Sequence, residues 1–504
     1  MRHFQLAPLF RDGAVLCRNK EIRVFGTAEE DVFLTLTLRD ESGKELAKDA
    51  LTVRNKTFCF LLPPQKAQTD CTLTLFSKTD SVTYTGIAIG DVYLAGGQSN
   101  MELELQNADE GQALFPVHSN PLVRYFNVPK YARFSDEMER ANENARWIPV
   151  APGTAKDMSA AAYFFAMKLQ PHLGVPVGII DCYWGGTSIT CWMDEEALNR
   201  TAEGQRYMRE YRESWAGKTM EQYLAEEKAF FDGQNEWNEK AAPIRAARPG
   251  VTTQEIAEII GPCPPWTPPV GEGSPYRPAG LAHTMLERVI PASLTGVLFY
   301  QGEEDTWRTQ HYDILLTSFI LRLRERFQDG ELPFLNVQLP MWIDGAAQED
   351  SMLWPALRMA QQRVYQTVRN TGLAVLLDAG EFDNIHPTNK RIVGERLYEA
   401  ALDVVYHEPA RLSPMALSKY QKDGRLYIAL SAPVTARQEG EYWLEIAGED
   451  GAFRMAEVML NGTTLILSHP DIPRPVMARY AWRDYAIVRL FGENGMPLAP
   501  FLLK

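Results

Sequence analysis

Residues 91–101 read DVYLAGGQSNM, a nearly apolar run followed by two glycines, a glutamine and Ser99. A run that is apolar on both faces is typical of a buried strand in a parallel sheet. Gly96 and Gly97 allow a tight turn and a close backbone approach where the strand ends. The stretch therefore predicts a serine at the carboxyl edge of a parallel sheet, which is where open α/β sheets bind their ligands.

Four more apolar runs have this character: VGIIDCYWGG (177–186), GVLFYQG (296–302), PFLNVQLP (333–340) and LAVLLDAG (373–380). Segments with helical periodicity separate them, and we expect helices starting at Ser159 and covering 315–327, 354–369 and 389–402. Strands alternating with helices predict an α/β fold whose parallel sheet is covered by helices on both faces.

The two ends of the chain differ from the middle. Residues 1–88 and 406–504 contain short alternating runs broken by turn signals, which predict β-rich, sandwich-like domains. The central α/β domain is then expected at 89–405. Within it, residues 197–270 are first charged and helical and then rich in proline, and we interpret them as an insertion that forms a lid or one wall of the site.

The formal net charge is −14 over 504 residues, which argues against binding to nucleic acid or to an anionic membrane surface. The N-terminus lacks the apolar run of a signal peptide, and no stretch is long enough to span a membrane. Six irregularly spaced cysteines indicate buried thiols in a reducing compartment. We therefore expect a cytoplasmic, bacterial protein, and whether it forms a homo-oligomer is left open.

The residues that follow the apolar runs carry candidate chemistry. Ser99 follows the first run, and Gly185-Gly186 after the second can present a bare N–H to a ligand. Gln301 comes directly after a third run and is followed by three carboxylates, at 303–305. Each feature also has a structural interpretation: a capping serine, an ordinary tight turn and solvated loop acids.

The last run leads into Asp383 and His386, which lie three residues apart in one short loop. That spacing lets the Asp383 carboxylate accept a hydrogen bond from the His386 ring and stabilise an imidazolium. Taken together, the strand ends offer a nucleophile, N–H and amide donors and an acid–base pair. This combination is what acyl transfer requires.

These segments resemble the sialate O-acetylesterase family of the SGNH-hydrolase superfamily. The resemblance is carried by GGQSNM (96–101), WGGTSITCW (184–192), FYQGEED (299–305) and DNIHPTNK (383–390), and more weakly by 277–291 and 479–501. It implies an SGNH-type, flavodoxin-like parallel sheet. It also implies a carbohydrate acetylesterase that needs no metal and no organic cofactor.

The resemblance assigns roles to single residues. Ser99 becomes the nucleophile, His386 the general base and later the acid, and Asp383 the residue that orients the histidine. The backbone N–H groups of Ser99 and Gly186 would stabilise the oxyanion. Many members of the family carry Asn where this chain has Asp305, and a carboxylate cannot donate there; we expect Asp305 to turn away and Gln301 to supply the side-chain donor.

The substrate implied by the resemblance is an O-acetylated sugar, first of all an O-acetylated sialic acid. Substrate contacts are expected from Gln98, Asn100, Trp184, Glu303, Asp305 and Arg308. The alternatives are an esterase acting on acetylxylan or another plant glycan, a sugar O-acetyltransferase and a non-catalytic glycan-binding protein. We expect the two β-rich ends to support the catalytic domain structurally rather than to bind glycan.

Overall fold

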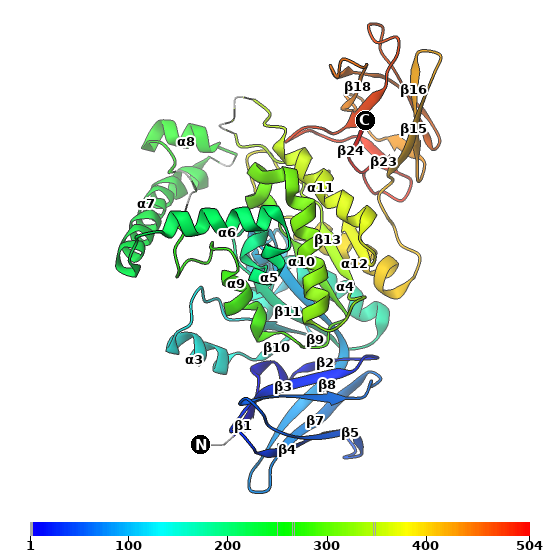
Figure 1. Cartoon of the computed structure of the whole chain (residues 1–504). Helices are drawn as coiled ribbons and strands as arrows, with labels where there is room; N and C mark the ends of the chain where they lie inside the picture. The colour runs from blue at the N-terminus through cyan, green and yellow to red at the C-terminus, as the bar shows by residue number, and fades with distance from the viewer. Residues whose placement is uncertain (1–3, 249, 265, 267, 346, 348) are drawn as a thin grey trace.

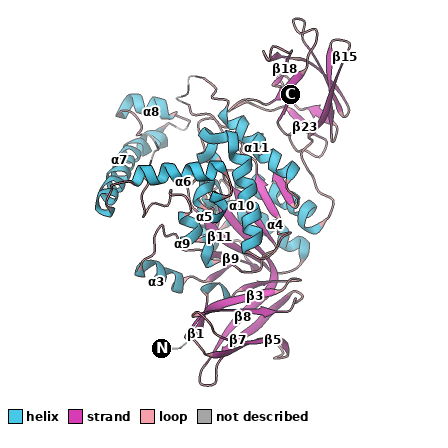
Figure 2. Cartoon of the chain, viewed as in Figure 1, coloured by secondary structure: helices cyan, strands magenta, loops and turns pink. Residues whose placement is uncertain are grey.

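The computed structural model describes residues 4–248, 250–264, 266, 268–345, 347 and 349–504. The chain runs from N-terminal β-sheets through a central sheet flanked by helices to a C-terminal group of β-sheets (Figure 1). A helical arm, from α6 (Ala202–Trp215) to α8 (Thr253–Ile260), projects from the central part (Figure 2). The mixed α/β fold predicted from the sequence is confirmed.

The central sheet is built around β8 (Ser81–Gly97). Five parallel strands have the spatial order β11-β8-β12-β13-β14, with β11 at Val177–Tyr183, β12 at Gly296–Tyr300, β13 at Phe334–Val337 and β14 at Thr371–Ala374. Numbered among themselves, with the outer parallel strand described next left out, these five strands have the chain order 2-1-3-4-5 of flavodoxin-like sheets. Two further strands extend the edge beyond β11: β9 (Asn120–Asn127), which is parallel to it, and β10 (Trp147–Val150), which is antiparallel to β9.

Helices cover the central sheet. Every residue of β11 and β12 is buried, so both faces of the sheet are shielded from water. Two helix pairs pack along it: α4 (Ala160–Leu173) against α12 (Lys390–Ala401), and α10 (Tyr312–Arg326) against α11 (Leu353–Thr367). Ser159 and Asn389 cap α4 and α12 with their side chains, as expected at helix starts.

One of the two N-terminal sheets is continuous with the central sheet. β1 (Phe4–Leu6), β3 (Ile22–Ala28) and β6 (Thr57–Leu62) form one layer. The other layer joins the first half of β8 through β2 (Val15–Cys17) and β7 (Gln68–Phe76), and extends through β4 (Phe33–Arg39) to β5 (Glu45–Thr52). The expected boundary at residue 88 therefore lies inside β8, and both regions share one hydrophobic core.

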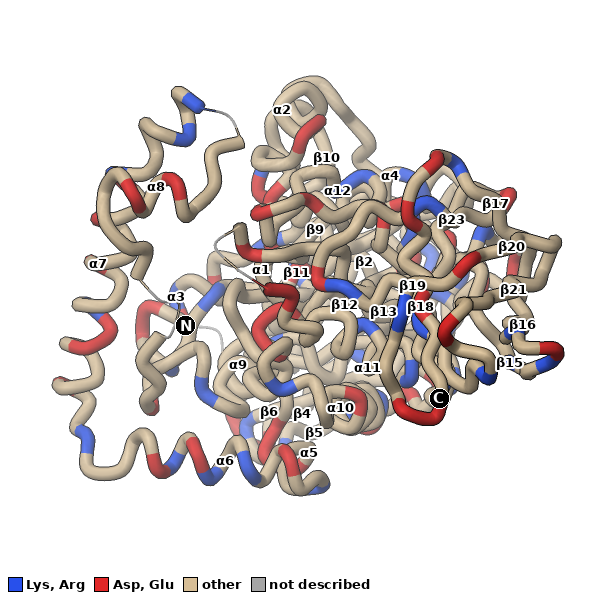
Figure 3. Tube along the Cα trace, turned by 90° about the horizontal axis from the view of Figure 1, so that it is seen from above, with Lys and Arg blue, Asp and Glu red and all other residues tan. Residues whose placement is uncertain are grey.

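The insertion is helical, as its sequence indicates. After α5 (Glu195–Asn199) come α6 (Ala202–Trp215), α7 (Met220–Ala247) and α8 (Thr253–Ile260). Acidic and basic residues both occur along α6 and α7 (Figure 3). The shorter helices elsewhere are α1 (Ser99–Glu102), α2 (Gly111–Leu114), α3 (Asp136–Asn144) and α9 (Gly280–Thr284).

The C-terminal part contains two four-stranded antiparallel sheets and a short pair. One sheet has the order β15-β16-β21-β20 (Ala416–Lys422, Arg425–Leu430, Thr464–Ser468, Glu457–Asn461). The other has the order β19-β18-β22-β24 (Arg454–Met455, Leu444–Ala447, Met477–Tyr480, Phe501–Leu503). The pair is β17 (Val434–Ala436) with β23 (Leu490–Gly492). Their core is separate from the main one but includes Met341, Leu373, Val375 and Leu377 of the central part.

The joint between the central and C-terminal parts is polar as well as apolar. Arg358 on α11 is fully buried and donates to the carbonyls of Pro340, Ala481 and Arg483. Asp484 accepts from the Ser351 N–H at 2.7 Å, close to the start of α11. These contacts fasten the 481–484 segment to α11 and to the loop before it.

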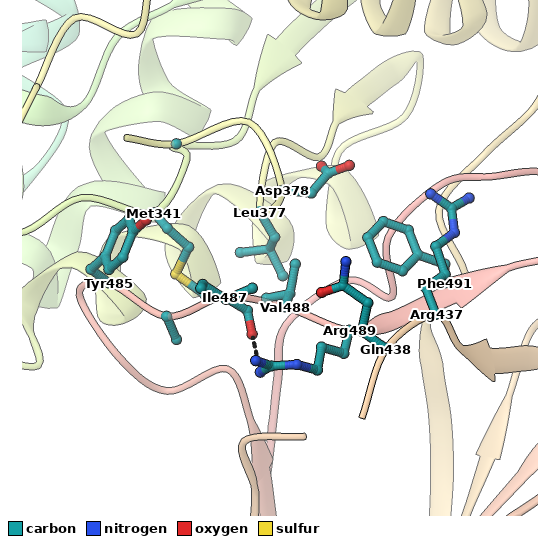
Figure 4. Close-up of a pocket in the computed structure, with 12 residues that line it drawn as sticks. Met341, Leu377, Asp378, Arg437, Gln438, Tyr485, Ile487, Val488, Arg489 and Phe491 are labelled. Atoms are coloured by element: carbon teal, nitrogen blue, oxygen red, sulfur yellow. Dashed lines mark hydrogen bonds between the residues drawn. The ribbon is translucent and has the colours of Figure 1, made fainter. Parts of the chain in front are cut away.

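A pocket of about 420 Å³ lies at this joint (Figure 4). Met341 and Leu377 line it from the central part, and Ile487 and Phe491 from the C-terminal part. It is distinct from the strand ends that carry Ser99 and His386.

Among the described residues, no helix combines the length and the apolar character needed to cross a membrane. The six cysteines are free thiols. Four of them are buried as expected, and Cys59 is partly buried. Cys263 in the insertion is exposed, so the prediction of buried thiols is wrong for that residue.

Replacing Arg358 by Met should destabilise the protein by about 3 kcal/mol or more, because three buried carbonyls lose their donor and Asp484 loses a nearby cation. Urea unfolding followed by tryptophan fluorescence measures this. The control is Arg369→Met, just beyond the end of α11, where the side chain is exposed. Equal stabilities for the two variants would show that the buried guanidinium does not hold the joint.

Candidate functional site

The strand ends of the central sheet bring Ser99 and His386 together. Ser99 starts α1 directly after β8, and His386 lies in the loop between β14 and α12. The turn depends on Gly97, which has φ +132° and lies so close to the Tyr300 carbonyl that a Cβ would overlap it. The glycine thereby places Ser99 beside the end of β12.

The Ser99 Oγ lies 2.8 Å from the Nε2 of His386, a hydrogen-bond distance. Partial burial and the nearby charge of Lys390 lower the pKa of His386 below its ordinary value of 6.5, and the charge of Glu102 opposes that shift. The imidazole is therefore neutral near pH 7 and can accept the serine proton.

Asp383 does not make the contact that its spacing predicts. Its backbone is left-handed, with φ 55°, and its carboxylate accepts from the Gly345 N–H at 2.6 Å and the Thr253 N–H at 3.0 Å. Within the described chain, no hydrogen bond joins this carboxylate to the His386 ring. The physical reason is that both carboxylate oxygens face backbone donors from other segments.

The Gly185-Gly186 turn presents one N–H to the site. The Gly185 N–H donates to Glu102 at 2.5 Å, and Glu102 also pairs with Lys130. The Gly186 N–H makes no hydrogen bond to any described residue, and Gly186 lines a pocket beside Ser99. The expectation that Gly186 is the available glycine agrees with this geometry, whereas the role of Glu102 was not anticipated.

Gln301 and Asp305 are both turned into the protein. Asp305 accepts from the Ser188 hydroxyl at 2.6 Å and the Ile189 N–H at 2.8 Å, so it faces away from the site as expected. Gln301 is fully buried, and its Nε2 donates to Asp305 at 2.6 Å and to the Thr187 carbonyl at 3.1 Å. The amide that was predicted to face the oxyanion therefore has its donors occupied inside the protein.

Asn100 brings the serine turn and the histidine loop together. Its buried side-chain amide donates to Glu303 at 2.6 Å and to the Ile385 carbonyl at 2.8 Å, and it accepts from Lys390 at 2.5 Å. Burial lowers the pKa of Lys390 to about 7. Asn100 was predicted to contact substrate, but these bonds make it a buried residue that links three segments. Lys390 was not singled out from the sequence, because a lysine at the start of a helix looks structural.

Gln98 is also internal. It is 3% exposed, and its Oε1 accepts from the Gln301 amide at 3.2 Å and from the Gly302 and Glu304 N–H groups at 3.3 Å. The predicted substrate contact is therefore replaced by bonds that shape the loop after β12.

A pocket of about 660 Å³ opens beside Gly186 and Ile385, next to the Ser99–His386 pair. Its walls are largely aromatic and include Tyr207, Tyr211, Trp266, Tyr276, Trp307, Trp342 and Trp354. Trp184, predicted to contact substrate, is partly buried and lies near the Tyr276 hydroxyl in this wall. Flat aromatic faces beside polar groups suit a ligand that is part apolar and part hydroxylated.

The pocket also carries charged groups. Arg308 stacks on Trp307, with 3.9 Å from the guanidinium carbon to the ring centroid, and pairs with Glu210. Glu303 and Glu304 line the same pocket, and burial raises the pKa of Glu304 to about 8. Of the residues predicted to contact substrate, Glu303 and Arg308 thus face the pocket.

Known proteins resemble this chain over most of its length. Residues 266–403 match the family model for carbohydrate esterases described as sialic acid-specific acetylesterase. The sialate O-acetylesterase of Mus musculus is 25% identical over 95% of this chain and 90% of its own length. That of Rattus norvegicus is 25% identical over 76% of this chain and 70% of its own.

A solved structure, a carbohydrate acetylesterase from Xanthomonas citri, has a TM-score of 0.77, with 25% identity over 99% of both chains. The likeness thus extends to the N-terminal sheets. The resemblance expected from the sequence is confirmed, and the comparisons support assignment as a carboxylic ester hydrolase.

Replacing Gly186 by Ala should lower the hydrolysis of 4-nitrophenyl acetate by about 10²-fold or more, because it displaces the free N–H. Gly186 has φ +68°, and a Cβ there would lie 2.8 Å from the Trp266 ring. The control is Gly217→Ala, which has a similar φ of +78° but open space around it. If both variants keep full activity, the Gly186 N–H is not part of the reacting site.

Proposed function

We propose that the protein removes O-acetyl groups from a carbohydrate, with Ser99 as nucleophile and His386 as general base. The observation that carries this is the 2.8 Å contact between the Ser99 hydroxyl and His386 beside the unpaired Gly186 N–H. A nucleophile, a base and a candidate oxyanion donor at the same strand ends form the arrangement that acyl transfer needs. The strand order 2-1-3-4-5 supports an SGNH-type catalytic domain.

The reaction begins when His386 takes the Ser99 proton and Oγ attacks the acetyl carbonyl. The negative charge on the carbonyl oxygen is stabilised by the N–H groups of Ser99 and Gly186, neither of which donates to a described residue. His386 then passes its proton to the departing sugar hydroxyl. Water attacks the acetyl-enzyme with His386 again as base, and acetate leaves.

Hydrogen bonds fix the positions of two carboxylates near the reacting groups, those of Asp305 and Glu102. Asp305, whose carboxylate would oppose an oxyanion, is held by Ser188, Ile189 and Gln301. Glu102 fixes the Gly185 N–H and lies near enough to His386 to favour its protonated form. We infer that Glu102 supplies part of the stabilisation that the sequence assigned to Asp383.

Two sugar classes are candidates. The relatives are named as sialate O-acetylesterases, so O-acetylated sialic acid is the substrate we propose first. A neutral acetylated glycan is favoured by a different observation: the arginine that lines the pocket, Arg308, is already paired with Glu210. A cytoplasmic location in a bacterium remains a prediction.

The first experiment compares wild type, Ser99→Ala and His386→Ala on 4-nitrophenyl acetate. Each variant should lose at least about 10³-fold in kcat, because the nucleophile and its base act as a unit. Ser81→Ala, in the N-terminal half of β8 and far along the chain from the site, is the control. Retained activity in Ser99→Ala would remove the serine mechanism.

Acetate release from 9-O-acetylated sialic acid and from acetylated xylotriose then identifies the sugar class. Cleavage of the sialic acid ester supports the first candidate. Cleavage of the xylotriose ester alone supports the neutral glycan.

The pH profile tests the electrostatics of His386. Only the neutral imidazole can act as base, so kcat/KM should fall as pH drops through its pKa, at a value below 6.5. Glu102→Gln removes a charge that favours the imidazolium, so this acidic limb should move to lower pH, while the glutamine oxygen still accepts from Gly185.

Glu104→Gln is the matched control, since Glu104 bonds to Gln106 and not to the glycine turn. An acidic limb that stays in place or moves upward in Glu102→Gln would contradict the assigned influence of Glu102.

A further inference from the structure

The helical insertion packs as a unit of its own beyond the pocket. Trp237 and Ala241 of α7 and Ile256 of α8 form a small buried cluster that is separate from both larger cores. In Figure 1 these two helices project away from the central sheet. The position of α7 and α8 therefore depends on a few contacts with the body rather than on a shared core.

One of those contacts is made by Asp383. Its Oδ2 accepts from the N–H of Thr253, the first residue of α8, and its Oδ1 from the Gly345 N–H. The backbone N–H of Asp383 donates to the Ile343 carbonyl at 3.2 Å. A carboxylate at the start of a helix is favourable, because the first N–H groups have no partner within the helix. Asp383 thus joins the insertion to the loop that carries His386.

The other end of the insertion contacts Gly186, the proposed oxyanion donor. The Trp266 ring lies over Gly186, and Phe230 and Phe231 of α7 pack against it with ring centroids 5.6 Å and 6.5 Å away. Tyr276 contacts the same ring at 6.1 Å. A displacement of α7 would therefore move the aromatic wall above the oxyanion donor.

We propose that Asp383 is a positioning residue that holds α7 and α8 in place, so that Trp266 lies over Gly186 and completes the sugar-binding wall. This inference rests on the proposed function. It assigns Asp383 to recognition of the sugar rather than to proton transfer. A small aryl ester needs only Ser99, His386 and the oxyanion donors, whereas a sugar ester also needs the wall.

Thr253→Pro tests the contact without touching Asp383. Thr253 is the first helical residue, where proline fits and the capping side chain of Thr252 stays intact, but its N–H is lost. We expect kcat/KM for 9-O-acetylated sialic acid and acetylated xylotriose, whichever wild type cleaves, to fall about tenfold. Turnover of 4-nitrophenyl acetate should change less than twofold, roughly the scatter expected for a change away from the reacting groups. Thr253→Ala keeps the N–H and should match wild type.

Asp383→Asn should reproduce the loss on the sugar ester, and the double variant Asp383→Asn, Thr253→Pro should be no worse than Asp383→Asn alone. Hydrogen exchange of the α8 amides gives a readout independent of activity and should be faster in both single variants but not in Thr253→Ala.

Two outcomes would overturn the proposal. A loss of about 10⁴-fold in 4-nitrophenyl acetate turnover for Asp383→Asn would show that Asp383 orients His386. Unchanged sugar turnover and α8 exchange in Thr253→Pro would show that the contact does not hold the wall. The proposed function itself fails if Ser99→Ala stays active or if wild type cleaves neither sugar ester, so its failure is distinguishable from the failure of this inference.

Discussion

The site depends on one buried amide. Asn100 bonds to Glu303, to Lys390 and to the backbone of the histidine loop, and so ties together the segments after β8, β12 and β14. These segments are far apart in the chain, and each would otherwise hold its side chains only loosely. A buried polar group whose donors and acceptors are all used specifies one arrangement, because any other leaves groups unpaired in a medium of low polarity. The short distance between Ser99 and His386 follows from this constraint.

The sequence was sufficient for the features that depend on local pattern. Apolar runs located the strands of the central sheet, and the rule that ligands bind at strand ends brought Ser99 and His386 to one edge. The helices predicted from Ser159 and from Asn389 followed from helical periodicity, and both residues cap their helices in the structure. Residue 88, the expected boundary, lies within β8, whose burial changes along its length from an alternating exposed and half-buried pattern to a fully buried one. That change of pattern looked like the end of a domain, although the strand is continuous.

The errors in the site share a cause. A spacing of three between Asp383 and His386 says nothing about the left-handed backbone at Asp383 or about donors contributed by residues 253 and 345. Gln301 was expected to face the oxyanion, but its partners Thr187 and Tyr312 come from other segments. Glu102 and Lys390 were passed over because an acid or a base in a helix is ordinary in sequence. Side-chain orientation is decided by contacts distant in the chain, which one sequence does not display.

The shared strand β8 also has a consequence for synthesis on the ribosome. Its first half pairs with β7 and β2, all made early, whereas its second half lies between β11 and β12. The last of these ends at Tyr300, so about 200 residues must follow Gly97 before both neighbours exist. At about 5–20 residues per second that interval is roughly 10–40 s. For that time the apolar end of β8, just before Ser99, has an open edge, which makes the nascent chain a natural client for chaperones that bind extended apolar segments.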